Sequence, residues 1–199
     1  MPTSPCLDSI CVFCGSSNAA ASAWLTDAAR LGAILAREGL RLVYGGGGVG
    51  LMGACARAAH GAGGRVLGVI PRFLVGDERP VPAIETIVVA SMHERKARMF
   101  ETADAFAVLP GAIGTLEEAV ELISWRRLGL HAKPLVFHNP GGFWDPLFSL
   151  FEQFVDRRLV PAAFSDCWQA VDDVERVVPM LRAMALADPG AGRRVVELI

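Results

Sequence analysis

The sequence lacks the features that mark a membrane, secreted or nucleic-acid-binding protein. No apolar run among its 199 residues approaches the roughly 20 that a membrane helix needs, and the opening residues lack the charged-then-apolar plan of a signal peptide. The formal net charge is −2, which gives no attraction for nucleic acid or an anionic membrane surface. The five cysteines are an odd number without framework spacing, which favours a reducing compartment. We therefore expect a soluble, cytoplasmic protein without nucleic-acid or membrane partners.

What is present is typical of one ordered globular unit. Apolar residues make up 52% of the chain and charged residues 20%, and the length allows a substantial core. No repeat, linker or low-complexity segment divides the sequence. We expect a single domain over residues 1–199, with residues 1–8 and about 188–199 as peripheral tails.

Short β-branched runs alternate along the chain with amphipathic or alanine-rich stretches. The runs predict strands over residues 9–15, 41–45, 65–71, 84–90, 105–110 and 134–139. The stretches predict helices over 24–39, 51–60, 92–102, 115–128 and 143–159, with a Pro-rich loop over 72–82. The last third is weaker, with a short strand at 167–171, a helix at 173–184 and a tail at 192–199. This alternation indicates an α/β protein with a Rossmann-like, doubly wound, mostly parallel sheet and helices on both faces.

Three glycine-rich turns fall at the carboxyl ends of predicted strands, the edge where ligands bind in such folds. The densest contains Gly48-x-Gly50-x-x-Gly53, the spacing of a dinucleotide fingerprint. The acidic residue that holds the ribose of NAD is missing, because nothing acidic follows the next strand until Asp77. We favour the approach of a phosphate or ribose over tight backbone packing, which stays the alternative, and we do not expect bound NAD.

The first glycine-rich turn follows Cys11 and Cys14. A period of two along a strand points these cysteines to opposite faces, so we interpret them as buried structural thiols. No second C-x-x-C completes a zinc site, and we expect no metal. The turn itself, Gly15-Ser16-Ser17, is small enough to surround a ligand.

A third constellation opens the helix predicted at 92–102. Ser91 and Glu94 fit a capping box, in which each side chain satisfies a backbone donor of the other residue. Arg95 and Lys96 follow, although cations near a helix N-terminus oppose the helix dipole. They suggest an anion at the ligand edge; a solvated basic face with Arg98 is the alternative.

The third turn, over residues 109–115, leads into another helix N-terminus, where backbone N–H groups favour an anion. Thr115 and Glu118 fit a capping box with Thr115 as N-cap. Because Arg95 and Glu118 both occupy the first turns of helices at the same sheet edge, a cation and a carboxylate should meet there. That pairing favours a site over two caps.

Together these segments resemble the Lonely Guy (LOG) family, the cytokinin riboside 5′-monophosphate phosphoribohydrolases, whose members are often called lysine decarboxylases. The resemblance runs from about Ile10 to Asn139. It rests on the family signatures P-G-G-x-G-T-x-x-E and M-x-x-R-K, met here at Pro110, Gly111, Gly114, Thr115, Glu118, Met92, Arg95 and Lys96. Ala112 replaces the second glycine of the signature, which would cost roughly 1 kcal/mol or more only if that position needs a positive φ.

The resemblance implies hydrolysis of the N-glycosidic bond of a cytokinin riboside 5′-monophosphate, or of AMP, to free base and ribose 5-phosphate, without a cofactor. It places the 5′-phosphate on the N–H groups of Gly111, Ala112, Ile113, Gly114 and Thr115. Glu118 would then act at the anomeric carbon with Arg95 as its catalytic partner, and Lys96 would add to substrate binding. Glu117 would be a solvent-facing or helix-dipole residue.

Further substrate contacts implied by the resemblance are Gly15, Ser16, Gly46, Gly47, Glu78, Met92 and Ser124. Family members are usually homodimers that complete the site across the interface, and the helix at 115–128, which carries Trp125, is a candidate for that interface.

Two other functions stay open. A non-catalytic nucleotide or cofactor carrier could use the same fold, and Ala112 is its best support. A pyridoxal-phosphate lysine decarboxylase would need a Schiff-base lysine, and only Lys96 and Lys133 are available.

Overall fold

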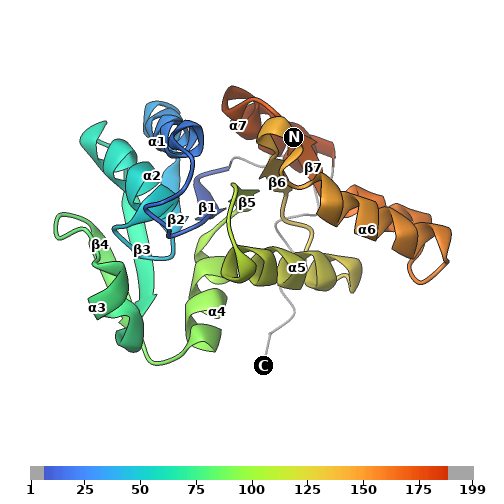
Figure 1. The fold of residues 1–199 in the computed structure, drawn as a ribbon, viewed down its shortest axis with the longest axis horizontal. Coiled ribbons are helices and arrows are strands. Elements are labelled where there is room, and N and C mark those ends of the chain that lie inside the picture. The colour runs from blue at the N-terminus through green and yellow to red at the C-terminus, as the bar shows by residue number, and fades with distance from the viewer. Residues whose placement is uncertain (1–6, 188–199) are drawn as a thin grey trace, which may run out of the picture.

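The computed structural model describes residues 7–187, which form one parallel sheet between two helical layers (Figure 1). All neighbouring strands pair in parallel, in the order β4-β3-β2-β1-β5-β6-β7. The strands are β1 Ser9–Phe13, β2 Arg41–Tyr44, β3 Val66–Pro71, β4 Glu85–Val89, β5 Ala105–Val108, β6 Leu135–His138 and β7 Gln169–Val171. The chain builds outward from β1 to β4 and then returns to β5 beside β1. This confirms the doubly wound α/β fold and puts its switch point between β1 and β5.

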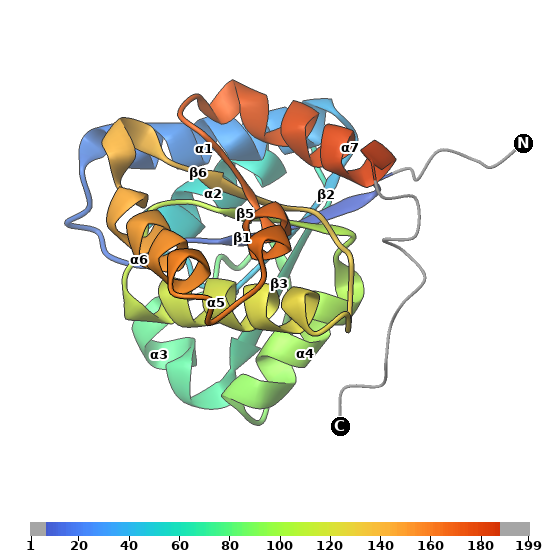
Figure 2. The same ribbon diagram turned by 90° about the vertical axis from the view of Figure 1, so that its right-hand side faces the viewer.

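Helices cover both faces of the sheet (Figures 1 and 2). One layer holds α1 Ser22–Arg37, α2 Gly50–Gly61 and α7 Val177–Ala187, whose apolar residues share a core cluster. The other holds α4 Met92–Thr102, α5 Ile113–Arg127 and α6 Asp145–Asp156, which share a second cluster. Among the described residues, no helix is both long and apolar enough to span a bilayer.

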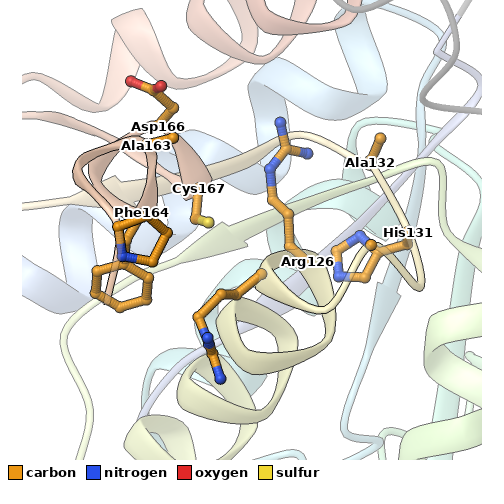
Figure 3. Close-up of a pocket in the computed structure, with 10 residues that line it drawn as sticks. Arg126, His131, Ala132, Ala163, Phe164, Asp166 and Cys167 are labelled. Carbon is orange, nitrogen blue, oxygen red and sulfur yellow. The ribbon is translucent and has the colours of Figure 1, made fainter. Parts of the chain in front are cut away.

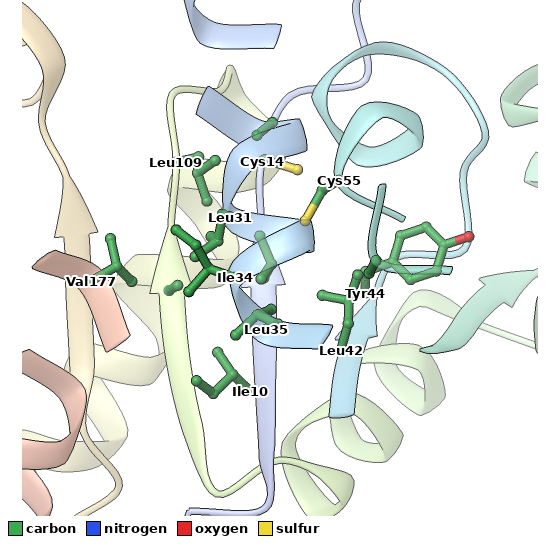
Figure 4. Close-up of a cluster of buried hydrophobic side chains, with 14 of the residues drawn as sticks. Ile10, Cys14, Leu31, Ile34, Leu35, Leu42, Tyr44, Cys55, Leu109 and Val177 are labelled. Atoms are coloured by element: carbon green, nitrogen blue, oxygen red, sulfur yellow. The ribbon is translucent and has the colours of Figure 1, made fainter. Parts of the chain in front are cut away.

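Strand β1 divides its side chains between the two clusters. Ile10 and Val12 face the layer of α1 and α2 (Figure 4), while Cys11 and Phe13 face the layer of α4 and α5. Cys14 returns to the first side, so the prediction that the two cysteines point to opposite faces is confirmed. Both are buried free thiols whose pKa values are raised, mainly by burial.

Three local predictions were wrong in detail. The loop over 72–82 begins with a 3-10 turn, η1 Arg72–Leu74, and one helical turn, α3 Val75–Glu78. Its prolines stand only at the flanks of these turns, so none interrupts them. Helix α5 begins at Ile113 rather than Thr115. The helix predicted at 173–184 opens as a 3-10 turn, η4 Val174–Arg176, before α7.

The predicted tails lie almost entirely outside the described residues. Asp8, at the described N-terminal end, forms an ion pair with Arg65 at 2.8 Å. The tail predicted at 192–199 lies outside residues 7–187.

Candidate active site

A cavity of about 120 Å³ lies beyond the carboxyl ends of β1 and β5, at the switch point. It contains nine of the residues that the sequence predicted for the site: Gly15, Ser16, Glu78, Met92, Arg95, Ala112, Gly114, Thr115 and Glu118. Six further lining residues were not predicted: Val12, Phe13, Cys14, Gly45, Met52 and Met99. The turns after β1 and β5 are joined directly, since the Gly15 N–H donates to the Pro110 carbonyl at 3.1 Å.

Arg95 reaches the cavity from the first turn of α4 and is 6% exposed. Its Nε donates to the Val69 carbonyl at 3.2 Å and its Nη2 to the Gly45 carbonyl at 3.1 Å. A Cβ at Gly45 would overlap the guanidinium, so only glycine fits there. The glycine run was visible in the sequence, but nothing in it indicated which glycine makes room for the arginine.

Glu118 faces Arg95 from the second turn of α5. Its Oε1 lies 3.8 Å from Arg95 Nη1, and the residue is 8% exposed. Burial raises the pKa of Glu118 to about 7, against the opposing charge of Arg95. The nearby charge of Glu117 also raises it. A carboxyl group poised near neutral pH suits proton transfer in catalysis.

The N-terminus of α5 opens toward the cavity without a side-chain cap. Ala112 is the N-cap, and the Leu116 N–H makes a 3.0 Å hydrogen bond to its carbonyl. The N–H groups of Ile113, Gly114 and Thr115 precede that bond and therefore have no acceptor within the helix. Backbone donors at a helix N-terminus, together with the dipole, favour an anion.

The capping box predicted from Thr115 and Glu118 was wrong. The helix starts two residues earlier than predicted, which puts Thr115 inside it, where a Cβ at Gly111 would overlap the Thr115 side chain. Glu118 is thereby free to face Arg95. Ala112 has φ −97° and ψ −153°, an extended conformation in which a methyl group causes no backbone strain. The departure from the family signature is therefore compatible with the loop.

The glycine run before α2 is packed against protein, contrary to the preferred interpretation. The Gly50 N–H donates to Asn18 Oδ1 at 2.9 Å, and the Gly15 carbonyl accepts the N–H groups of Leu51 and Met52. Neighbouring backbone or side-chain atoms would obstruct a Cβ at each of these glycines: Gly45, Gly46, Gly47, Gly48, Gly50 and Gly53. Close approach of the chain to itself therefore accounts for the run.

Glu78 enters the cavity from α3. Burial raises its pKa, and its Oε2 is buried without a hydrogen-bond partner among the described residues. The Glu78 carbonyl accepts the Gly48 N–H at 2.6 Å, which holds α3 against the turn after β2. A buried, unpaired carboxylate oxygen needs a donor, and a ligand hydroxyl can supply one.

Six predicted substrate contacts do not line the cavity: Gly46, Gly47, Lys96, Gly111, Ile113 and Ser124. Lys96 instead pairs with Glu117 and, at 3.0 Å, with Glu121, so it links α4 to α5. Glu117 is thus an ion-pair partner, although half of its side chain is exposed. Ser124 is exposed on α5.

The helix start at Met92 is capped in part as predicted. Ser91 Oγ accepts the Glu94 N–H at 3.1 Å. Glu94 Oε2, however, accepts the N–H of Ala90 at 2.8 Å rather than that of Ser91.

Neither lysine of the sequence faces the cavity. Lys133 is buried and donates to the carbonyls of Phe100 and Ala103 at 2.6 and 2.8 Å, where it caps the end of α4. Lys96 is held by its two glutamates. Within residues 7–187, no group of three or more His, Cys, Asp or Glu side chains could hold a metal ion.

Comparisons with known proteins agree with the motifs. A family model described as possible lysine decarboxylase matches residues 52–181, more than half of the chain. Cytokinin riboside 5′-monophosphate phosphoribohydrolase LOG7 of Arabidopsis thaliana is 45% identical over 190 residues, which cover 95% of this chain and 80% of the relative. The probable enzyme of the same name LOGL1, from Oryza sativa subsp. japonica, is 45% identical over 177 residues, covering 88% and 78%.

The molybdenum cofactor carrier protein of Chlamydomonas reinhardtii superposes with a TM-score of 0.66 over 88% of this chain and 96% of that chain. At 20% identity this is a likeness of fold alone.

Fold and cavity together define a Rossmann-type α/β protein with a buried carboxylate and guanidinium at its switch point. Within that class the chain belongs to the Lonely Guy (LOG) family, whose model and relatives cover most of its length. The family assigned from the sequence motifs is confirmed.

Proposed function

We propose that this protein hydrolyses the N-glycosidic bond of a cytokinin riboside 5′-monophosphate and releases free base and ribose 5-phosphate. The observation that carries the proposal is a buried Glu118, opposite Arg95, one turn beyond an uncapped helix N-terminus. The names of the relatives that match most of the chain support the same substrate class.

The start of α5 receives the 5′-phosphate in this proposal. The N–H groups of Ile113, Gly114 and Thr115 face the anion, and the helix dipole adds to their attraction. Ile113 contributes through its backbone only, since its side chain is 79% exposed. The ribose then extends from the phosphate toward Glu118.

Glu118 acts at the anomeric carbon. Cleavage of an N-glycoside passes through an oxocarbenium-like state, whose positive charge a carboxylate stabilises while it also activates water. The base departs with the bonding electron pair. One water is consumed, its hydroxyl ending on the anomeric carbon and its proton on the released base.

Arg95 holds Glu118 in its ionised form and contacts substrate. Two of its nitrogens are fixed by backbone carbonyls, which leaves Nη1 directed toward Glu118. Because the guanidinium opposes the effect of burial on the pKa of Glu118, a larger fraction of the carboxyl group is ionised at neutral pH.

The remaining predicted contacts surround this centre. Glu78 accepts a ribose hydroxyl, which gives its buried Oε2 a partner. Gly15, Ser16 and Met92 lie around the base. Lys96 acts by fixing α4 against α5 through Glu117 and Glu121, while Gly46, Gly47 and Ser124 keep their proposed roles through the family resemblance alone.

A second copy of the chain covers the outer face of α5 in this proposal. Ile113, Val120 and Leu128 are 79%, 39% and 59% exposed on that helix. Trp125 does not belong to this face, because its ring packs on Phe100 at 5.3 Å. A homodimer would bury the exposed residues beside the cavity, and the Val120→Asp variant should shift the mass in light scattering toward a monomer.

The compartment that we propose is the cytoplasm, because the four described cysteines are free thiols.

Product analysis tests the reaction. Wild-type protein and Glu118→Gln would be incubated with isopentenyladenosine 5′-monophosphate and with AMP, and the released base measured by chromatography. We expect release by the wild type and none above background by the variant. Equal turnover of both nucleotides would make the enzyme a general AMP nucleosidase. Binding without release by the wild type would make the protein a carrier and contradict the proposal.

A further inference from the structure

A second cavity lies at the other end of α5 and has no part in the proposed reaction. Its volume is about 560 Å³, within the range of small-molecule sites. It is lined by residues from the last turn of α5, the loop before β6 and the 3-10 turn η3 Ala162–Cys167: Arg126, Arg127, Gly129, His131, Ala132, Pro161, Ala163, Phe164, Asp166 and Cys167. Because α5 has 15 residues, its length of roughly 20 Å separates this cavity from the helix N-terminus beside the catalytic cavity.

Two guanidinium groups dominate the charge of this cavity. Arg126 uses Nη1 to donate to the Lys133 carbonyl at 2.7 Å, which fixes its position and leaves its other donors available. Neither Arg126 nor Arg127 has a carboxylate within ion-pair distance among the described residues. Asp166 is the only acidic residue of the lining, so the cavity carries an excess of positive charge.

The charges of Arg126 and Arg127 both influence the Cys167 thiol in the cavity wall. Burial raises the pKa of the Cys167 thiol, while the charges of Arg126 and Arg127 oppose that shift. Figure 3 shows Arg126 rising between the turn that carries Cys167 and the loop that carries His131. The helix dipole favours basic residues in the last turn of α5, which is an alternative reason for the presence of the two arginines. The dipole does not, however, explain why a cavity lies beside them.

Apart from Arg126, Arg127 and Asp166, the residues that line this cavity carry no charge. His131 is 2% exposed, and its ring lies between the Leu122 carbonyl and the Lys133 N–H, at 3.0 and 3.1 Å. Burial lowers the pKa of His131 to about 4, so the ring is neutral at physiological pH. Phe164 lies on the side of the cavity away from His131 (Figure 3), and Pro161 adds further apolar surface to the lining.

We propose that this cavity is a second ligand site, which takes a small anion made of a phosphate or carboxylate on a flat apolar body. The guanidinium groups of Arg126 and Arg127 bind the oxyanion, for which their planar donors are suited. Phe164 and Pro161 contact the apolar body. The site is independent of the proposed hydrolysis.

Isothermal titration with phenyl phosphate tests the assignment. Arg127→Gln is the first variant, because Arg127 is exposed and its side chain makes no hydrogen bond within residues 7–187. We expect its affinity for phenyl phosphate to fall roughly tenfold or more, as for the loss of a charge-assisted hydrogen bond. Arg126→Gln should give a similar loss. Arg157→Gln, which removes an equal charge from the exposed end of α6, should bind like the wild type.

Two further measurements distinguish binding at this site from binding in the catalytic cavity and from attraction by charge alone. Binding should persist in Ile113→Pro, which alters only the start of α5, and inorganic phosphate should bind at least about tenfold more weakly than phenyl phosphate because it lacks the apolar body. Unchanged affinity in both arginine variants would overturn the site. A fall in affinity of roughly tenfold in Ile113→Pro would assign the binding to the catalytic cavity, and equal affinity for inorganic phosphate would overturn the ligand class.

Discussion

Two helices, α2 and α5, begin at the same edge of the sheet after glycine-rich turns, yet only one presents free donors. At α2, Asn18 and the Gly15 carbonyl accept the first N–H groups. At α5, no side chain caps the helix, and the N–H groups of Ile113, Gly114 and Thr115 have no acceptor within it, while Gly114 and Thr115 line the cavity. Glycine density therefore does not locate an anion site. What locates it is whether the first backbone donors of the helix are already occupied.

The largest change in kcat should come from replacing Glu118. This residue belongs to α5, the helix whose N-terminus has no side-chain cap. Glu118→Gln keeps the side-chain shape and removes the carboxylate, so kcat should fall by roughly 10³-fold, in the range of a lost acid–base group. Nucleotide affinity should change little. Steady-state base release and equilibrium binding measure the two quantities.

Glu117→Gln is the matched control for that substitution. Its side chain is half exposed and paired with Lys96, so kcat should stay within about twofold of the wild type. If Glu118→Gln retained more than a tenth of wild-type kcat, Glu118 would not be at the chemistry.

Replacing Arg95 should change the pH dependence as well as the rate. An ionised Glu118 is required, so kcat/KM of the wild type should fall as the pH drops through about 7. Arg95 lowers the pKa of Glu118, and its removal in Arg95→Met should therefore move this acid limb to higher pH. The rate should also fall by roughly 10²-fold.

Arg95→Lys, which keeps the positive charge, serves as the comparison for the pH profile. Its acid limb should lie closer to that of the wild type than the limb of Arg95→Met. An acid limb at lower pH in Arg95→Met would reverse the sign and contradict the electrostatic role.

A proline substitution can remove one of the backbone N–H groups at the start of α5. Ile113→Pro removes one N–H at the first helical position, where proline is tolerated, and the preceding Ala112 already has an extended conformation. KM for the nucleotide should rise roughly tenfold, as expected for one hydrogen bond to a charged group. The corresponding riboside without phosphate should show no such change, and an equal rise for both substrates would point to a general disturbance.

A substitution at the N-terminus of α2, whose first N–H groups already have acceptors, should change the stability of the protein and leave KM unchanged. Asn18→Ala removes the acceptor of the Gly50 N–H, and the free energy of unfolding should drop by about 1 kcal/mol in denaturant titration. KM should stay within about twofold. A tenfold rise in KM with unchanged stability would place substrate on the α2 turn instead.

The smallest effect should come from restoring the family glycine at position 112. Because φ of Ala112 is −97°, Ala112→Gly relieves no strain, and activity should stay within about twofold. Added freedom of the unfolded chain should lower stability by at most about 1 kcal/mol, read from the same denaturant curves. A large gain in activity would show that the methyl group obstructs the phosphate.

The sequence was sufficient for the sheet, because most of its parallel strands are short apolar runs bounded by turns. It was also sufficient to bring Arg95 and Glu118 to one edge. The sequence could not show which of the two glycine-rich turns leaves the first N–H groups of its helix without acceptors. The acceptors at α2 are Asn18 and the Gly15 carbonyl, which lie more than thirty residues away in the chain.

The capping box predicted at the start of α5 was wrong because the local sequence pattern does not determine where the helix begins. Thr115 and Glu118 have capping-box spacing, but the extended Ala112 is the N-cap, so the helix begins two residues earlier, at Ile113. The sequence predicts Lys96 as a ligand for an anion, but in the structure its ammonium pairs with Glu117 and Glu121 on the neighbouring helix. Each error concerns a partner supplied by tertiary packing.

The most direct test of the account is a crystal structure of Glu118→Gln with isopentenyladenosine 5′-monophosphate bound. We predict that the phosphate lies against the N–H groups of Ile113, Gly114 and Thr115, with the anomeric carbon facing residue 118 and Arg95. A phosphate on the turn before α2, or a ribose directed away from residue 118, would contradict the central claim.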